Sequence, residues 1–409
     1  MVKPGYKQTE IGVIPEDWDI KSLQDIVVSP LSYGVNAPAV PYDSNLYRYI
    51  RITDITEDGH YSKEDEVSVN ILDGEKYCLC KGDILLARTG ASTGKTYLYR
   101  TQDGKLVYAG FLIRASVDVD NYNPFYVFAQ FHTKRYQDWV STMSIRSGQP
   151  GINGKEYSSY LLPIPKIGEQ KQIATTLSDI DALITNLEKL IAKKKAIKQG
   201  AMQELLTGKR RLPGFDGEWG NVVIGENGYL LRESINPQIM PLSVFSEYSM
   251  PAFDFGKKPN RVVGADMHSN RTVISGNVLL FNKLNVRQKR IWLVCASEKN
   301  AVCSSEFLPY CSDAISLRFL AHILGTEEVT AYFIGSSTGT SNSQKRITPA
   351  TFLEYSLFAP LEISEQNAIA DVLDNMDREI VQLEQKLKKY QNIKCGMMSE
   401  LLTGRIRLV

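Results

Sequence analysis

The chain has 409 residues, 43% of them hydrophobic and 23% charged, and its formal net charge is +1. These values are ordinary for a globular protein of two or three domains. No run of 18 apolar residues occurs, and the polar N-terminus lacks the apolar core of a secretion signal. The six cysteines and four histidines have no metal-ligand spacing. We therefore expect a reduced, cytoplasmic protein with no membrane span and no metal site.

The first segment, residues 1–165, carries a glycine-rich loop, RTGASTGKT, at residues 88–96. The loop comes close to a nucleotide-binding P-loop, but Thr89 stands where the first glycine belongs. Aromatic and β-branched residues also follow it, where a P-loop needs a helix. Its cationic and hydroxyl side chains suit the phosphates and base edges of a DNA duplex. The candidate DNA-binding residues here are Arg88, Thr89, Ser92 and Lys95. The alternative is an ordinary solvated turn between two strands.

Two further stretches lie in the same segment. NPFY at residues 123–126 is similar to the motif of adenine methyltransferases, but Phe125 replaces the second proline and the chain has no G-x-G loop for a methyl donor. We expect Asn123 and Pro124 to begin a helix instead. SIRSGQPGING at residues 144–154 combines small, amide and basic residues, and it adds Arg146 and Gln149 as candidate DNA-binding residues.

The strongest organisational signal is an internal repeat. Residues 167–212 and 363–408 align without a gap at an offset of 196, with 22 identities in 46 positions. The chain is therefore a tandem duplication. We predict a first recognition domain over 1–165, a central repeat helix over 166–210, a second recognition domain over 211–361 and a C-terminal repeat helix over 362–409.

Each repeat has apolar residues spaced alternately four and three positions apart, which is typical of the seam of a coiled coil. The seam residues are Ile173, Leu177, Ile180, Ile184, Leu187 and Ile191 in the first copy, and Ile369, Leu373, Met376, Ile380, Leu383 and Leu387 in the second. We expect Gly208 and Gly404 to end the helices. Gly200 and Gly396 suggest a close backbone approach or a bend.

A helix of this kind, about 57 Å long at 1.5 Å per residue, exposes an apolar stripe and needs a partner. The other copy in the same chain is the expected one. The pair would form an intramolecular antiparallel coiled coil with pseudo-two-fold symmetry that holds the two domains at opposite ends. The alternative is that each helix packs on its own domain.

The second domain has a cationic, amide-rich stretch at the position of the first loop. SGNVLLF at residues 275–281 matches KGDILLA at residues 81–87, and NKLNVRQKRIWLV follows it. Arginine and lysine suit guanine, and asparagine and glutamine suit adenine. The candidates are Lys283, Asn285, Arg287, Gln288, Lys289 and Arg290, together with Lys345 and Arg346 from residues 336–346. Lysines and arginines at 193–198 and 209–211 are expected to contact DNA or a partner, or else to form a solvated helix face.

The repeated helix ending in LLTGKRRL, the opening GYKQTEIGVIPEDWDIKSLQDI and the stretch KGDILLARTGASTGKT resemble the specificity (S) subunit of type I restriction–modification systems. The resemblance covers essentially the whole chain. It implies an α+β protein with two globular α/β target-recognition domains, each reading half of a split site on double-stranded DNA. The repeat helices would set the gap between the half-sites.

The resemblance also implies partners. Two modification (M) subunits would bind S-adenosylmethionine and methylate adenine, and restriction (R) subunits would use ATP and Mg to translocate and cleave DNA. The S chain would bind no cofactor and catalyse nothing. A coiled-coil scaffold or adaptor that does not read DNA is the alternative.

Overall fold

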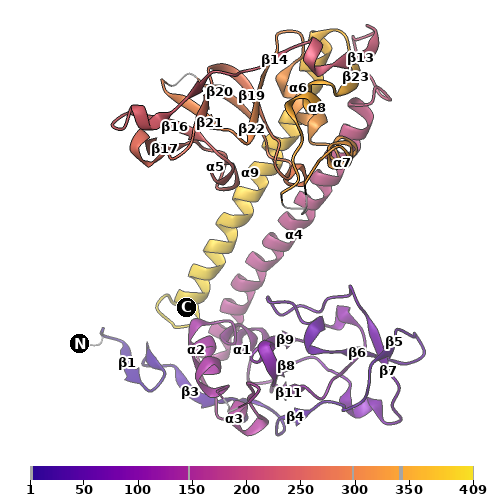
Figure 1. Ribbon diagram of the computed structural model, residues 1–409. Coiled ribbons are helices and arrows are strands. Elements are labelled where there is room, and N and C mark those ends of the chain that lie inside the picture. Colours follow the sequence, from indigo (N-terminus) through magenta and orange to yellow (C-terminus); the bar gives the residue numbers. More distant parts are fainter. Residues whose placement is uncertain (1–2, 146–147, 297–298, 340–343, 409) are drawn as a thin grey trace. The chain divides into compact units, whose positions relative to one another are not determined.

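The computed structural model describes residues 3–145, 148–296, 299–339 and 344–408. Contacts divide the chain into two units. Unit 1 comprises residues 1–188 and 386–409, and unit 2 comprises residues 189–385 (Figure 1). Each unit therefore contains one globular domain, the first part of one long helix and the last part of the other.

The domain of unit 1 contains two four-stranded sheets and two smaller strand pairs. One sheet has the order β4 (Ser32–Tyr33), β11 (Leu112–Ser116), β8 (Asp83–Ala87) and β9 (Thr96–Leu98). The other has the order β10 (Leu106–Tyr108), β6 (Tyr47–Ile50), β7 (Val67–Val69) and β5 (Val40–Pro41). The pairs are β1 (Tyr6–Thr9) with β2 (Gly12–Pro15), and β3 (Asp19–Ser22) with β12 (Leu161–Ile164).

The domain of unit 2 repeats this plan. Its first sheet has the order β14 (Tyr229–Leu230), β22 (Phe307–Cys311), β19 (Gly276–Asn282) and β20 (Ile291–Ala296). Its second sheet has the order β15 (Ser234–Ile235), β18 (Arg271–Val273), β21 (Ala301–Ser304), β16 (Val244–Tyr248) and β17 (Asn260–Val263). The remaining pair is β13 (Trp219–Val223) with β23 (Ser356–Pro360).

Short helices complete both domains. Unit 1 has α1 (Pro124–Gln130), α2 (Lys134–Met143) and α3 (Gly154–Ser158). Unit 2 has α5 (Met250–Asp254), α6 (Leu317–Leu324), α7 (Glu327–Gly335) and α8 (Pro349–Leu353). Asn123 caps α1, because its side chain accepts a hydrogen bond from the Tyr126 N–H at 3.0 Å and Pro124 fills the first helical position. The expectation that NPFY begins a helix is confirmed.

The repeats form the long helices α4 (Ile167–Leu205) and α9 (Ile363–Leu401), of 39 residues each. Each helix is followed three residues later by a glycine in the left-handed region, Gly208 with φ 71° and Gly404 with φ 69°, which completes the turn that stops it. A side chain at Gly404 would lie 2.5 Å from Pro15, so this position also needs glycine for space. By contrast, a Cβ added at Gly200 or Gly396 would meet nothing within 4 Å. No described segment makes the close approach considered for those two glycines.

The two helices run antiparallel in each unit. In unit 1, Lys394 on α9 binds Asp181 on α4 at 2.6 Å. In unit 2, Lys198 on α4 binds Asp377 on α9 at 2.5 Å. These two ion pairs are related by the repeat offset of 196, since Asp181 corresponds to Asp377 and Lys394 to Lys198. The coiled coil is thus pseudo-two-fold symmetric in its contacts.

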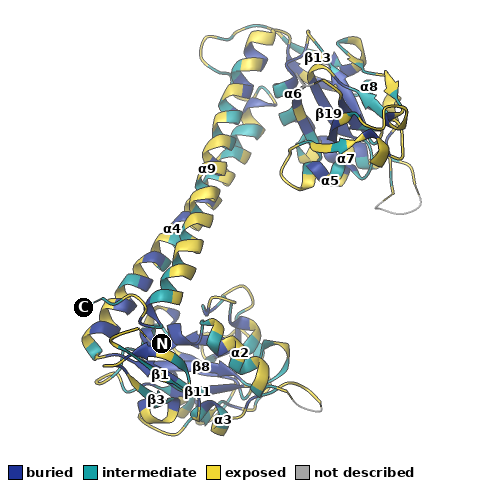
Figure 2. Ribbon diagram, turned by 90° about the vertical axis from the view of Figure 1, so that its left-hand side faces the viewer, coloured by how far each residue is buried: buried dark blue, intermediate teal, exposed yellow. Residues whose placement is uncertain are grey.

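Burial along the helices follows the alternating four- and three-residue spacing, and Figure 2 shows buried and exposed residues alternating along both. Ile173, Leu177, Ile369 and Leu373 are at most 1% exposed and join the cores of the two domains. The other seam positions range from buried to half-buried: Ile180, Ile184, Leu187, Ile191, Met376, Ile380, Leu383 and Leu387. Packing of each helix on its own domain, the alternative considered above, therefore accompanies the helix pairing rather than replacing it.

Among the described residues, no helix has both the length and the apolar character needed to cross a bilayer. Nor do the described histidine, cysteine, aspartate and glutamate side chains gather in groups of three that could hold a metal ion.

Candidate nucleic-acid interface

The two candidate loops leave equivalent central strands. β8 in unit 1 begins after Gly82 (φ 97°), and β19 in unit 2 begins at Gly276 (φ 70°). Both strands lie between two neighbours in a four-stranded sheet, and all five residues of β8 are buried. The buried residues of β8 and β19 fix the position at which each loop begins. The loops therefore begin at matching places in the two units.

In unit 1 the structure brings the two predicted stretches together. Thr89 forms a β-bridge with Gly151, and the Gly90 N–H donates to the Pro150 carbonyl at 3.0 Å. Gln149, which is exposed, lies beside Gly90. Residues 88–95 and 149–151 thus form one surface. Arg146 lies outside the described residues.

Two cations of this surface are already engaged within the domain. The Arg88 guanidinium lies 4.8 Å from the centre of the Tyr33 ring, and its buried Nε has no hydrogen-bond acceptor among the described atoms. Lys95 forms an ion pair with Glu57 at 2.7 Å. A phosphate bound by Lys95 would therefore compete with Glu57. Thr89 and Ser92 are half-exposed beside them.

The loop after β8 cannot cradle a nucleotide in the manner of a P-loop. A single 3₁₀ turn, Gly90–Ser92, follows it, and then strand β9. A P-loop presents the N-terminus of a helix to the phosphates, and no helix begins here. The expected sequence of strand, turn and strand is confirmed.

In unit 2 the loop after β19 folds as a tight turn. Asn285 (φ 51°) and Lys289 (φ 46°) both adopt the left-handed conformation, which is unusual for residues other than glycine. They flank a 3₁₀ turn, Val286–Gln288, so that Arg287 and Gln288 lie exposed at its tip. Strained backbone of this kind occurs preferentially at functional sites. No feature of the sequence indicated this strained turn.

The second stretch of unit 2 also joins its loop. The Asn285 N–H donates to the Lys345 carbonyl at 2.8 Å, and the Ile347 N–H donates to the Lys283 carbonyl at 3.1 Å. A β-bridge joins Leu284 to Arg346. The two units therefore build the same two-loop surface from unrelated sequences.

Three of the predicted cations in unit 2 are ion-paired. Lys289 binds Glu327 at 2.5 Å, and Arg346 binds Glu306 at 3.1 Å. Arg290 binds both carboxylate oxygens of Asp254 at 2.8 and 2.7 Å, and this hydrogen bonding lowers the pKa of Asp254. Within the described part of the chain, the side chains of Lys283, Arg287 and Lys345 have no ionic partner. These three are the cations most available to DNA.

Comparison with known proteins agrees with this arrangement. A family model described as "Type I restriction modification DNA specificity domain" matches residues 15–199. The chain is 25% identical to the putative type I restriction enzyme MjaX specificity subunit of Methanocaldococcus jannaschii, over 98% of this chain and 97% of that protein. It is 24% identical to the MjaVIII specificity subunit of the same organism, over 97% and 94%. The chain is therefore similar to type I specificity subunits over nearly its whole length.

The fold of this chain is shared with a solved structure. The S subunit of the type I restriction–modification system from M. genitalium has a TM-score of 0.62 and covers 94% of this chain and 96% of its own. Their sequence identity is only 13%. The architecture is thus common to two sequences that have diverged almost completely.

Sequence reasoning missed a pair of polar junctions that fix the starts of the two long helices. In unit 1, Arg407 binds Glu169 and Asp17, and the Trp18 Nε1–H donates to Glu169 at 3.1 Å. The hydrogen bonds to Glu169 and Asp17 raise the pKa of Arg407, and the bond to Arg407 lowers the pKa of Asp17. The first-turn glutamate of α4 is therefore a buried ion-pair partner, and not only a complement to the helix dipole.

In unit 2, Arg211 binds Glu365 in the same way at 2.6 and 2.7 Å. The following glutamines also match. Gln170 Nε2 donates to the Pro165 carbonyl at 2.8 Å, and Gln366 Nε2 donates to the Pro360 carbonyl at 2.9 Å. Each glutamine thus ties the start of its helix to the strand pair that precedes it.

The junctions and the coiled coil engage four cations of the basic stretches at 193–198 and 209–211. Lys194, Lys195 and Lys198 bind Glu379, Glu384 and Asp377, and Arg211 binds Glu365. Lys195 is 57% exposed, so this part of the helix face is solvated, and contact of these side chains with DNA or a partner stays a prediction. Their charges are used inside unit 2, because opposite charges line the two antiparallel helices.

Proposed function

We propose that this chain is a specificity subunit, which recognises a DNA target split into two half-sites and directs M and R subunits to it. One observation carries the proposal: the same scaffold occurs twice and bears two dissimilar sets of loops. Residues 88–95 have the sequence RTGASTGK and residues 283–290 have the sequence KLNVRQKR. Both segments nevertheless follow an equivalent central strand and form backbone contacts with a second loop. Two different loops on one scaffold suit two different half-sites.

The two exposed side chains at the tip of the unit 2 loop suit different parts of the DNA. Arg287 suits a phosphate or the O6 and N7 atoms of guanine, and Gln288 suits adenine. Each phosphate that is neutralised adds about −0.9 to the slope of log affinity against log salt. A bidentate base contact adds about 1–3 kcal/mol of discrimination without that salt signature. The two roles are therefore separable by measurement.

The paired helices are the proposed spacer. A helix of 39 residues is about 58 Å long, longer than the roughly 34 Å of one turn of B-DNA. Two linked readers gain affinity from each other only when both half-sites lie at a matching separation. Opposite orientation of the half-sites follows from the antiparallel pairing. We therefore expect a split target with a fixed, unspecified gap.

The chemical steps are assigned to the partner subunits. Two M subunits would carry S-adenosylmethionine and methylate adenine, and R subunits would use ATP and Mg to translocate and cleave DNA. The specificity subunit itself would bind none of these cofactors and would act as a non-catalytic, cytoplasmic reader. The geometry after β8 supports this division, since strand β9 stands where a nucleotide loop would need a helix.

The test is binding selection from randomised DNA, with the specificity subunit assembled with its cognate M subunit. The expected result is two short constant sequences separated by a fixed number of unspecified positions. Arg287→Ala should relax one half-site and leave the other unchanged. Lys258→Ala, an exposed cation of the same unit outside residues 283–290 and 345–346, is the matched control. Selection without any constant sequence would favour a scaffold that does not read DNA.

A further inference from the structure

The two candidate reading loops, residues 88–95 and 283–290, are held by the same backbone hydrogen bonds. Corresponding residues lie 195 positions apart, and four bonds from an N–H to a carbonyl repeat at this offset: Ala87 to Lys95 and Asn282 to Arg290, Arg88 to Phe111 and Lys283 to Glu306, Gly90 to Pro150 and Asn285 to Lys345, and Ile152 to Arg88 and Ile347 to Lys283. The two loops therefore have the same length and the same register.

The strands beside the loops keep this offset. Leu86 pairs with Thr96, and Phe281 pairs with Ile291. The pairing of β11 with β8 and of β22 with β19 follows the same offset. The match of KGDILLA with SGNVLLF, which has an offset of 194, is therefore one residue out of register. A slip of one residue turns each side chain of a strand to the other face, so the offset of 195 is needed to compare the loops.

Both loops turn at the same two positions. Gly90 (φ 77°) corresponds to Asn285 (φ 51°), and Gly94 (φ 92°) corresponds to Lys289 (φ 46°). Unit 1 uses glycine where unit 2 holds longer residues in the left-handed conformation. The backbone shape is thus kept although the residues differ.

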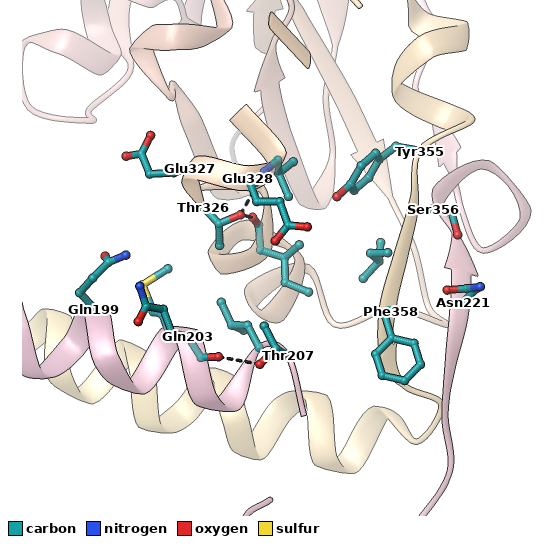
Figure 3. A pocket seen from close by; sticks show the side chains of 15 residues that line it. Gln199, Gln203, Thr207, Asn221, Thr326, Glu327, Glu328, Tyr355, Ser356 and Phe358 are labelled. Atoms are coloured by element: carbon teal, nitrogen blue, oxygen red, sulfur yellow. Dashed lines mark hydrogen bonds between the residues drawn. The ribbon is translucent and has the colours of Figure 1, made fainter. Parts of the chain in front are cut away.

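A short helix holds the second turning position in each unit. In unit 1 the hydroxyl of Tyr136, on α2, donates to the Gly94 carbonyl at 3.0 Å. In unit 2, Lys289 binds Glu327 at 2.5 Å, and Glu327 begins α7 and lines the cavity of about 560 Å³ shown in Figure 3. The ends of the loops are therefore fixed, and the residues between the turning positions form the tips.

The tips are where the chemistry of the two loops differs. Ser92 corresponds to Arg287, which is exposed, and Thr93 corresponds to Gln288. The Thr93 hydroxyl donates to the Gly90 carbonyl at 2.7 Å. Arginine binds guanine through two hydrogen bonds, whereas serine can bond to any base. One backbone position thus carries a selective side chain in unit 2 and an unselective one in unit 1.

The ends of the loops keep their charge instead. The first residue is Arg88 in one loop and Lys283 in the other, and the last is Lys95 in one and Arg290 in the other. Both last residues are held by a carboxylate, at 2.7 Å in each unit. Phosphates are the same in every DNA sequence, whereas base edges differ. Constant cations therefore suit the DNA backbone, and the differing tips suit the bases.

We infer that Ser92 and Arg287 occupy one equivalent reading position, whose side chain sets one base pair of each half-site. The inference rests on the proposed function and deepens it by naming the base. Arg287 selects guanine in the second half-site, and Ser92 leaves the matching base pair of the first open. An arginine placed at Ser92 acquires the same selectivity. Because the half-sites are proposed to run in opposite orientations, the two base pairs lie equally far from the gap, with their guanines on opposite strands.

The test is binding selection from randomised DNA with the full-length chain assembled with its cognate M subunit. Ser92→Arg should create a preference of about fivefold or more for guanine at one open position of the first half-site. That position should lie as far from the gap as the guanine that is lost in Arg287→Ser. The double exchange should move the guanine from one half-site to the other.

The exchange is limited to the tip, because a Cβ added at Gly94 would lie 2.7 Å from Val140. Ala91→Arg is the matched control, since Ala91 is exposed and the variant adds the same charge one residue away. Val286, the counterpart of Ala91, is 7% exposed, so this position does not face outwards in unit 2. Ala91→Arg should select no new guanine.

Several outcomes would overturn the inference. Parental half-sites selected by Ser92→Arg would show that this position reads no base. A guanine at a different distance from the gap would show that the two positions are not equivalent. The same guanine selected by Ala91→Arg would assign the effect to added charge alone. A parent chain that selected no split site would instead contradict the proposed function.

Discussion

Arg407 binds Glu169 through two hydrogen bonds, Nε to Oε1 at 2.7 Å and Nη2 to Oε2 at 2.8 Å, although 238 positions separate them in the chain. Arg211 repeats the contact with Glu365 at 2.6 and 2.7 Å. In each unit the segment that leaves one helix thus returns to the start of the other. The two contacts occupy equivalent positions in the two halves of the duplicated chain.

The junction arginines should be important for stability. Glu169 is 4% exposed and Glu365 1%, so loss of the arginine leaves a buried carboxylate without its partner. We expect Arg407→Ala to lower the free energy of unfolding by about 3 kcal/mol, and Arg211→Ala to lower it as well. Arg407→Lys should retain only part of the stabilisation, because lysine cannot form the bidentate contact with the carboxylate. Calorimetry of each variant measures this. Arg405→Ala, at an exposed side chain, should change stability by less than about 0.5 kcal/mol, and a stable Arg407→Ala would contradict the role given to the junction.

The apolar seam should hold the helices together more strongly than the ion pairs across it. Leu373 is fully buried, so Leu373→Ala should cost about 2–5 kcal/mol. Asp377 is 45% exposed, and the coupling energy of its pair with Lys198 should stay below about 1 kcal/mol in a double-mutant cycle. Denaturant unfolding of the single and double variants compares the two. A larger loss from Asp377→Ala than from Leu373→Ala would reverse this ranking.

His132 should make the stability of unit 1 depend on pH. Burial lowers its pKa from 6.5 to about 4, with Lys394 as a smaller cause. The unfolded chain therefore binds the proton first as the pH falls. This histidine's contribution to stability is complete above about pH 6.5 and is lost progressively towards pH 4. Unfolding midpoints measured across that range should fall less steeply in His132→Gln. Equal slopes in the parent protein and in His132→Gln would refute the assignment.

In the candidate interface, free cations should matter more than ion-paired ones. Arg287→Ala should weaken binding to DNA that contains the second half-site and should reduce the salt slope by about one. Lys289→Ala and Arg346→Ala should have smaller effects, because glutamates already hold both side chains. Fluorescence anisotropy at several salt concentrations distinguishes them. An equal loss in all three variants would mean that the ion pairs open on binding.

Lys95 allows the converse experiment for the first half-site, in which a paired cation is made free. Lys95→Ala should weaken binding there, and Glu57→Gln should strengthen it, since the lysine would no longer be paired. A weaker complex in Glu57→Gln would show that the ion pair positions the loop rather than competing with DNA.

The helices could be predicted from the sequence because their signal is local. The spacing of Ile173, Leu177 and Ile180 is a property of consecutive turns, and Gly208 marks the stop within the same stretch. The contact between Arg211 and Glu365 has no such signal, since 154 positions separate the two residues. The repeat alignment did contain a clue, because both residues are identical in the two copies.

Prediction of the loops has the same limit, because contacts with distant residues leave no local signal in the sequence. The residue types at 283–290 identify a cationic, amide-rich stretch, but which cations are free depends on acidic residues elsewhere in the domain. Asp254 and Glu327, which bind Arg290 and Lys289, lie 36 and 38 positions away from them. Tertiary contacts alone decide that Arg287 is left exposed at the tip of the turn.

The most direct test of the account changes the length of the proposed spacer. Insertion of four residues, about one helical turn and about 6 Å, into one repeat helix should lengthen the accepted gap between half-sites by one or two base pairs. Binding selection from randomised DNA should return the same two half-site sequences at the new separation. Unchanged spacing with unchanged half-sites would contradict the claim that the paired helices hold two readers a set distance apart.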